Sequence, residues 1–297
     1  MSVEARIAGQ EPPGGKLHDL GYRKYTGARK VGPRLWKVIA ARGLRSTIRT
    51  WYVILILTMA GMFWGGLAVW CYGVVQLTKA AKATQINAMA GQIGTIATVF
   101  LKTASIEKFF AFIAALFIGS AMLSDDFRTG GVAFYFARPI TRGVYLTGKL
   151  VPMLVIVACI TGVPPLLLAL ETVGVSGDPA SSVLFLQVAL HTAITVAALC
   201  APAAFISSLV KNRLLGAGVY FGVYFGSMIL GGVLGQMLGE TWAKCFSISE
   251  DIHVLGQVIY GQTPDAPPLV AAGVLTLLIG GSLAFAYQRL RTVDILG

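Results

Sequence analysis

Residues 124–149 read SDDFRTGGVAFYFARPITRGVYLTGK and form a polar, basic island between two long apolar segments. The island is too polar to cross a bilayer, because each charged side chain at the bilayer centre costs about 2.5–3.5 kcal/mol. It also combines glycines, a proline and both signs of charge, which is more specific than an unconstrained linker requires. The fold is therefore decided by the apolar segments on either side of this loop.

The composition is that of a helical membrane protein. Of the 297 residues, 56% are hydrophobic and only 12% are charged, whereas soluble domains contain about 25% charged residues. The mean hydropathy is +0.73, and apolar runs reach about 20 residues, the length that spans a bilayer. We therefore expect an all-α integral membrane fold, with a flexible cytoplasmic N-terminal segment (residues 1–32) and a single membrane domain (residues 33–297).

Six transmembrane helices are expected, and charge sets their direction. With both termini inside, most of the 24 Lys and Arg residues fall on the inner side, as the positive-inside rule requires. The same bias accounts for the net charge of +11 without a nucleic-acid partner. The predicted spans are residues 51–75, 106–123, 150–171, 183–210, 214–237 and 269–288.

Residues 33–49 have the pattern of an amphipathic helix. At 100° per residue the basic side chains fall on one face and the apolar ones on the other, which is typical of a helix lying in the membrane interface. A basic flank that only fixes the topology is a compatible alternative. The basic face consists of Arg34, Lys37, Arg42, Arg45 and Arg49, and the apolar face of Leu35, Trp36, Ile39, Ala40 and Leu44.

Two segments on the outer side are long enough to form helices there. Residues 76–105 carry an apolar stripe at helical spacing, and residues 238–266 contain Ser247 and Ser249, either of which could cap a short helix. Cys71 and Cys245 both fall on this side, where a disulfide between them is conceivable. The four cysteines lack the spacing of metal ligands, so we expect no metal site.

Small residues recur in the fifth span. Gly218, Gly222 and Gly226 follow each other at four-residue steps, and such positions let helix backbones approach closely in lipid. They predict a dimer seam, a moving interface near a transport path, or ordinary packing within one subunit. His191, in the fourth span, is either a proton-relay group or, as we favour, a side chain bonded to its neighbours.

Neither enzymatic chemistry nor ion coupling is suggested by the sequence. Glu107 and Glu171 fall at span ends, where carboxylates reach water, so no buried coupling acid is expected. The chain contains no metalloprotease, nucleophile-elbow or correctly spaced phosphate-loop motif. The membrane part therefore lacks an energy source of its own.

The loop itself can be divided into capped turns. Ser124 could cap a short helix with Asp125 and Asp126 in its first turn, and Gly130 would end that helix. Thr141 could cap the helix that enters the third span. Acids at one end and basic residues at the other suit docking onto a charged partner. A purely solvated loop is the alternative, but it leaves the aromatic run at residues 134–136 unexplained.

These loop residues resemble a known family. The pattern of an acid, a glycine, RPITR and a final GK resembles permease subunits of ABC exporters of the type 2 class. Residues 17–25, LHDLGYRKY, resemble the N-terminal segment of a branch that includes permeases serving nitrous oxide reductase maturation. The pattern is carried by Asp126, Gly130, Pro139, Thr141, Arg142, Gly148 and Lys149.

The resemblance implies a non-catalytic, multi-pass permease of the bacterial inner membrane. It would pair with a second permease subunit in a homodimer or heterodimer, surrounded by lipid, and with two copies of an ABC ATPase that hold ATP and magnesium. The chain would bind no cofactor itself. The resemblance implies that ATPase motion enters through Asp125, Asp126, Arg128, Gly130, Arg138, Pro139, Thr141, Arg142 and Lys149.

Two alternatives remain open at this stage. A secondary transporter or channel would need an ionisable group near the middle of the membrane, for which His191 is the candidate. A membrane scaffold for a periplasmic enzyme would use the outer segments instead.

Overall fold

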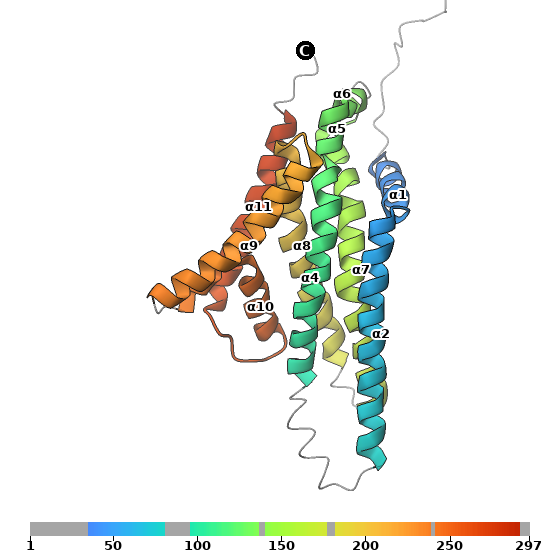
Figure 1. Ribbon diagram of the computed structural model, residues 1–297, viewed down its shortest axis with the longest axis vertical. Helices are drawn as coiled ribbons and strands as arrows, with labels where there is room; N and C mark the ends of the chain where they lie inside the picture. Colours follow the sequence, from blue (N-terminus) through green and yellow to red (C-terminus); the bar gives the residue numbers. More distant parts are fainter. Residues whose placement is uncertain (1–34, 81–95, 137–139, 177–181, 239–240, 292–297) are drawn as a thin grey trace, which may run out of the picture. The chain divides into compact units, whose positions relative to one another are not determined.

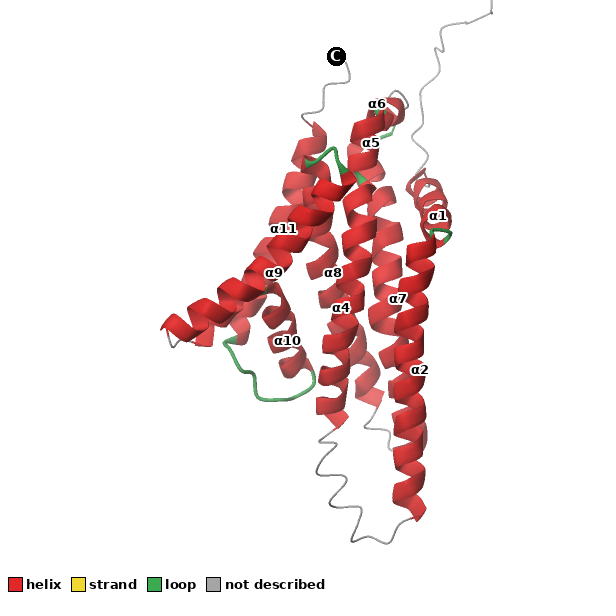
Figure 2. Ribbon diagram, viewed as in Figure 1, coloured by secondary structure: helices red, strands yellow, loops and turns green. Residues whose placement is uncertain are grey.

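The computed structural model describes residues 35–80, 96–136, 140–176, 182–238 and 241–291, and all regular elements in these ranges are helices (Figures 1 and 2). The predicted all-α fold is confirmed. Each predicted span corresponds to one helix: α2 (Trp51–Ala80), α4 (Ile96–Met122), α7 (Arg142–Ser176), α8 (Val183–Leu209), α9 (Arg213–Leu238) and α11 (Pro268–Arg291).

The count of spans depends on the first two helices. Five helices are long and apolar enough to cross a membrane, and a sixth span is obtained when α1 (Leu35–Ile48) and the start of α2 are counted as one bent pair. The bend between these two helices is 76°. A helix of this composition that leaves the span axis so sharply fits the predicted interfacial helix. The predicted 33–49 boundary includes Arg34, which lies outside the described residues.

Two of the predicted boundaries were wrong. The segment 76–105 was expected to be a separate outer helix, but its first residues extend α2 to Ala80 and its last begin α4 at Ile96. The apolar stripe therefore continues directly into the second span, where Phe100 is fully buried. Residues 81–95, with the rest of the stripe, lie outside the described part of the chain.

The helices alternate in direction, so their ends meet in two groups. At one end, which we call the loop end, the Arg142 Nη1 donates to the carbonyl of Arg291 (3.0 Å), which joins the start of α7 to the end of α11. The Arg213 guanidinium lies 5.6 Å from the Tyr52 ring, which joins the starts of α9 and α2. We call the opposite end the distal end.

The distal end holds two short elements between α9 and α11. They are η3 (Thr241–Phe246) and α10 (Ile248–Ile259). Ser247 is the cap of α10, because its hydroxyl accepts a hydrogen bond from the Glu250 amide at 3.4 Å. The expectation of a capped helix in this segment is thus confirmed. Cys245 is a buried free thiol and forms no disulfide, while the side chain of Cys71 lies outside the described set.

The centre of the bundle is formed by α4, α7 and α8, which pack against one another. These helices approach closely at Gly119, since a Cβ there would lie 2.6 Å from the Ala203 Cβ and 3.0 Å from the Met153 sulfur. Any larger side chain would push these helices apart. The glycine is therefore required by packing and not by backbone conformation.

Proline in α7 creates a second contact with α8. Pro165 has no amide hydrogen, so the Thr161 carbonyl four residues earlier loses its helical partner. The Thr192 hydroxyl of α8 donates to that carbonyl at 3.1 Å. In lipid, where water cannot satisfy a freed carbonyl, such a replacement is needed.

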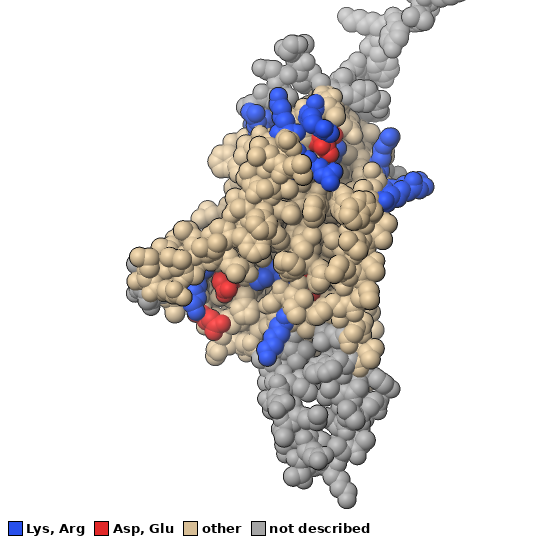
Figure 3. Space-filling view, viewed as in Figure 1, with Lys and Arg blue, Asp and Glu red and all other residues tan. Residues whose placement is uncertain are grey.

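Charge is unequally divided between the two ends. Figure 3 shows basic side chains gathered near α5, α6 and α11 at the loop end. In the described part of the chain, the acids outside the loop lie toward the distal end. They are Glu107, Glu171, Glu250, Asp251 and Asp265.

Candidate functional site

The loop between α4 and α7 is largely folded. It contains two short helices, α5 (Ser124–Thr129) and α6 (Gly131–Phe136). Gly130 separates them with φ of +72°, a left-handed conformation that glycine adopts without penalty. The prediction that Gly130 ends the first helix is confirmed.

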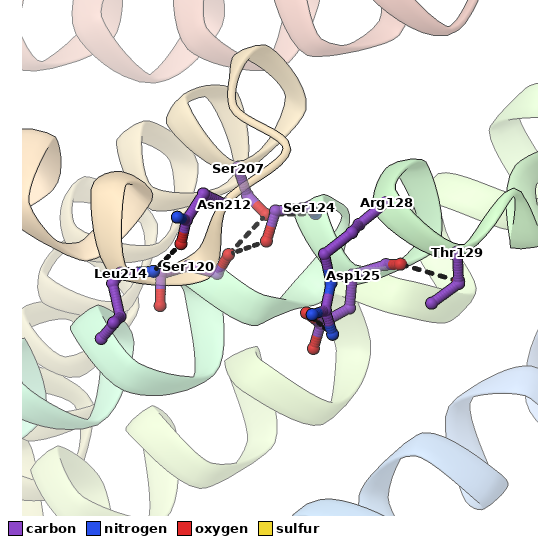
Figure 4. A network of polar contacts seen from close by, with 8 residues as sticks. All are labelled: Ser120, Ser124, Asp125, Arg128, Thr129, Ser207, Asn212 and Leu214. Carbon is purple, nitrogen blue, oxygen red and sulfur yellow. Dashed lines mark hydrogen bonds and ion pairs between the residues drawn. The ribbon is translucent and has the colours of Figure 1, made fainter.

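The junction of α4 and α5 is held by a serine of α8 (Figure 4). The Ser207 hydroxyl accepts hydrogen bonds from the amides of Leu123 (2.9 Å) and Ser124 (3.1 Å) and donates to the Ser120 carbonyl (3.3 Å). The predicted capping by Ser124 was wrong. Its hydroxyl donates back to the Ser120 carbonyl, because α5 nearly continues α4 and its first amides are already satisfied by Ser207.

Asp126 is the residue that ties the loop to the third predicted span. One carboxylate oxygen accepts a hydrogen bond from the Tyr145 hydroxyl (2.5 Å) and lies 2.6 Å from the Lys149 ammonium. The Lys149 and Asp126 side chains are only 21% and 17% exposed. A partly buried charge-assisted pair of this kind is stronger than a surface ion pair. Asp126 and Lys149 therefore act on each other inside this chain.

The aromatic run of the loop packs on the same site. Tyr145 is fully buried, and its ring lies 5.2 Å from Tyr135 and 5.5 Å from Phe136. The Lys149 ammonium lies 5.5 Å from the Tyr135 ring. Internal packing thus accounts for two of the three aromatics, while the side chain of Phe134 lies outside the described residues.

Helix α1 packs on α7 one residue away from this ion pair. A Cβ at Gly148 would lie 2.9 Å from the Ile39 Cβ and 3.2 Å from the Trp36 carbonyl oxygen. A Cβ at Gly43 of α1 would in turn lie 2.9 Å from Pro152 Cγ. The apolar face of α1 therefore packs on protein as well as on any membrane interface. Gly148 and Lys149 connect α7 to α1 and to α5 at successive positions.

Other predicted residues face away from the bundle. Asp125 and Arg128 form an exposed pair with an N–O distance of 3.6 Å, and Thr141 caps α7 by accepting from the Val144 amide at 3.4 Å. Arg138 and Pro139 lie outside the described residues. The basic residues Lys37, Arg42 and Arg45 of α1, and Arg49 directly after it, are exposed, as expected, and Trp36 is half-buried.

Three contributors to this site were missed from sequence. Tyr145 precedes Lys149 by four residues and so shares a helix face with it, which was a usable signal. Gly43 sits within the apolar face of α1, where a small residue marks close helix contact. Ser207 gave no signal, because its partners are backbone amides 83 and 84 residues earlier.

The glycine stripe of α9 faces open space in the described part of the chain. A Cβ at Gly218, Gly222 or Gly226 would meet no atom within 4 Å. Of the five helices long and apolar enough to cross a membrane, α9 has the smallest buried share, 17%. Among the described residues, no close packing partner is found for these three glycines.

The prediction that Glu107 reaches water was wrong. Because α4 begins at Ile96 and not near residue 106, Glu107 lies well inside the helix and is only 2% exposed. One of its carboxylate oxygens has no hydrogen-bond partner among the described residues. The next residue, Lys108, is also buried.

These features define a multi-span helical membrane protein with a folded polar loop at one end of its bundle. The described residues contain no group of three or more His, Cys, Asp or Glu side chains that could hold a metal ion. A sequence profile of the family described as ABC-2 family transporter protein matches residues 38–289. The chain belongs to this family, and it is a membrane permease component of an ABC transporter.

The family also bears on partners and chemistry. ABC-2 permeases generally work with an ABC ATPase, so the chain is a transport component and not itself a catalytic enzyme. No curated protein matches the chain.

Proposed function

We propose that this chain is the permease of an ATP-driven exporter and that residues 124–149 receive the motion of a separate ATPase subunit. The observation that carries this proposal is the contact of Asp126 with Tyr145 and Lys149. It fastens a short polar helix outside the bundle to the helix that continues through it. A displacement of α5 is thereby passed to α7.

Charge supports the proposed direction in the membrane. The loop end carries the basic residues of α1 and of the loop, and the positive-inside rule favours the cytoplasmic side for such an end. The most natural membrane for such a permease is the inner membrane of a bacterium, with both termini inside and residues 33–297 as one domain. Two ATPase subunits would hold ATP and magnesium there, and this chain would need no cofactor.

The ATPase would meet the exposed charges and not the buried pair. Asp125 and Arg128 on α5 are available for docking, as is the exposed basic face of α1. Asp126 and Lys149 then transmit the motion. This divides the nine loop residues predicted for coupling into those that touch the partner and those that shape the site.

A second permease subunit is proposed to pack on α9. Gly218, Gly222 and Gly226 present open space on the least buried span, which is where a second backbone could approach. A homodimer with lipid around its remaining surface is the simplest assembly. The resemblance of residues 17–25 supports a role like that of permeases serving nitrous oxide reductase maturation.

The coupling role is tested by reversing a charge that makes no buried contact. The tagged chain is captured from its native cells, and ATP hydrolysis by the bound ATPase is measured. Asp125→Lys is expected to reduce the captured ATPase activity by at least about fivefold, since a like-charge contact at a docking surface costs 1 kcal/mol or more. Glu250→Lys, an exposed acid at the distal end, is the control. Equal activity in wild type, Asp125→Lys and Arg128→Glu would contradict the proposal.

A further inference from the structure

A group of aromatic and basic side chains lies at the loop end, where α2 and α9 begin. Both helices pack on α4. The Arg213 guanidinium of α9 lies 5.6 Å from the Tyr52 ring of α2, and that ring lies 5.6 Å from the Phe117 ring of α4. One residue from each of the three helices therefore meets at this point. We call these three residues the Arg213 site.

The first turn of α9, which carries Arg213, is held in place by the fold. Asn212 caps this helix, because its side-chain oxygen accepts a hydrogen bond from the Leu214 amide at 2.9 Å (Figure 4). A Cβ at Gly216 would lie 3.7 Å from the Ser120 Cβ, so this turn lies directly against α4. The backbone that positions Arg213 is therefore fixed without any ligand.

Arg213 has no acidic partner in the described part of the chain. The acids described at the loop end are Asp125 and Asp126, and each already pairs with a basic residue other than Arg213. Arg49, three residues before Tyr52, is exposed, as Arg213 is. No carboxylate of the described residues lies within 4.0 Å of either guanidinium. The positive charge at this site is therefore available to an anion from outside the chain.

The surroundings of the site indicate that it lies at the level of the lipid headgroups. Trp51, next to Tyr52, is 75% exposed, and Trp and Tyr side chains concentrate at the membrane interface. The bend of 76° between α1 and α2 directly precedes these two residues. Two apolar side chains, Leu55 one turn further along α2 and Phe117 of α4, are also exposed. A basic group is thus joined to an exposed apolar surface.

We propose that the Arg213 site binds the headgroup of an acidic phospholipid from the leaflet at the loop end. The guanidinium of Arg213 binds the lipid phosphate, and Arg49 adds a second positive charge. The acyl chains lie along the exposed apolar surface of α2 and α4, which a free anion would leave unused. Basic clusters beside membrane spans are typical of acidic-lipid recognition. The proposal does not depend on the coupling role of the loop, because it needs no ATPase.

The test measures the thermal unfolding of the full chain in neutral detergent at constant ionic strength. Short-chain phosphatidylglycerol is compared with short-chain phosphatidylcholine, and inorganic phosphate is titrated as the free anion. Phosphatidylglycerol is expected to raise the midpoint temperature in a saturable manner and at lower concentration than the other two probes, since a ligand that binds the folded state stabilises it. An equal response to phosphatidylcholine, or to inorganic phosphate, would overturn the proposal.

Variants separate this site from the general basic surface of the loop end. Arg213→Gln is expected to weaken the binding of phosphatidylglycerol by about fivefold, the size expected for one basic residue beside an acidic lipid. Arg213→Lys keeps the charge and should lose less. Arg49→Gln provides a second variant if Arg213→Gln does not fold. Lys37→Gln, which removes an exposed charge near the other end of α1, should bind as wild type does.

Two results with these variants would contradict the proposal. One is an equal loss of binding in Lys37→Gln, which would indicate attraction to the whole basic surface. The other is unchanged binding of phosphatidylglycerol in the folded variants of Arg213 and Arg49. If the dimer fraction of Arg213→Gln also falls in that case, the site belongs to the contact with a second permease subunit and not to lipid.

Discussion

The Lys149 ammonium lies 2.6 Å from the Asp126 carboxylate, and both side chains are mostly withdrawn from solvent. This contact joins a six-residue helix in a loop to a 35-residue helix that enters the bundle. The two residues stand 23 positions apart in the sequence. Among the described residues, they form the ion pair between α5 and α7.

Removing one partner of this pair should destabilise the fold. Lys149→Met leaves the Asp126 carboxylate with Tyr145 alone, and we expect a loss of about 1–3 kcal/mol in unfolding free energy. Thermal unfolding in detergent, with the Asp126→Asn and double variants, gives the coupling energy. Asp125→Asn, whose carboxylate is exposed, is the control and should change little. A coupling energy near zero would show that the pair contributes nothing.

Enlarging Gly148 should displace α1. Gly148→Ala places a methyl group 2.9 Å from Ile39, and we expect a destabilisation of about 1–3 kcal/mol through overpacking. Gly143→Ala, on the same helix with no atom within 4 Å, should instead be neutral or stabilising by up to about 1 kcal/mol. Unfolding midpoints of the two variants are compared. Equal midpoints would mean that α1 does not pack closely on α7.

The titration of Asp251 should make the stability of the fold depend on pH. Burial, aided by Glu250, raises the pKa of this carboxyl to about 7, although the Cys245 thiol opposes the shift. The unfolded chain ionises Asp251 near the usual pKa of 3.8. The stability contributed by the neutral form is therefore complete below that value and is lost as pH rises through about 7.

Asp251→Asn removes this dependence, because an amide keeps the neutral shape at every pH. We expect its unfolding midpoint to exceed that of wild type at pH 8.5 and to approach the wild-type value at pH 5. Glu250→Gln should reduce the pH dependence only in part, because Glu250 is a minor cause of the raised pKa of Asp251. A difference between Asp251→Asn and wild type that does not vary with pH would refute this account.

Loss of the Thr192 hydroxyl should destabilise the fold, because Pro165 leaves the Thr161 carbonyl without a helical partner. Thr192→Val leaves the Thr161 carbonyl without its partner, and we expect a loss of about 0.6–1.7 kcal/mol, the range for hydrogen bonds between membrane helices. Thr276→Val serves as the control, since its hydroxyl bonds only the Ala272 carbonyl of its own helix. The measurement is again thermal unfolding. Equal losses in the two variants would rule out a special role for Thr192.

Bulky residues on the open face of α9 should weaken association of the permease subunits. Gly222→Leu is expected to lower the dimer fraction without lowering the unfolding midpoint of the monomer, because no atom lies within 4 Å. Gly273→Leu, at an equally open position on α11, tests whether any such change has this effect. Dimer fractions are measured by light scattering in detergent. An unchanged dimer fraction in Gly222→Leu would exclude α9 as the seam.

The arrangement of the chain was largely predictable from sequence, because long apolar runs dominate its energetics. Six spans, the helix before them and the cap at Ser247 all follow from local patterns. Glu107 was misplaced because the apolar pattern continues smoothly into α4, so nothing in the sequence marks where the bilayer surface lies. A boundary error of ten residues turned a buried acid into an exposed one.

The site was less predictable, since its contacts are between distant segments. Asp125 and Asp126 are adjacent and chemically identical, yet one faces outward and the other bonds Tyr145. That choice depends on how α5 turns after Leu123, which Ser207 of α8 sets. Only the packed structure brings these residues together.

Gly148 and Lys149 attach the first turns of α7 to two different helices. Gly148 leaves room for α1 on one side of the helix. Lys149 pairs with Asp126 of α5 on another side, about 100° around the same helix. Loss of either contact destabilises the fold but leaves the other contact in place. If both are lost, the hydrogen bond of Tyr145 to Asp126 and the close approach of Gly43 to Pro152 still attach α7 to α5 and α1. The connection between the membrane bundle and its loop end therefore rests on several contacts and not on a single residue.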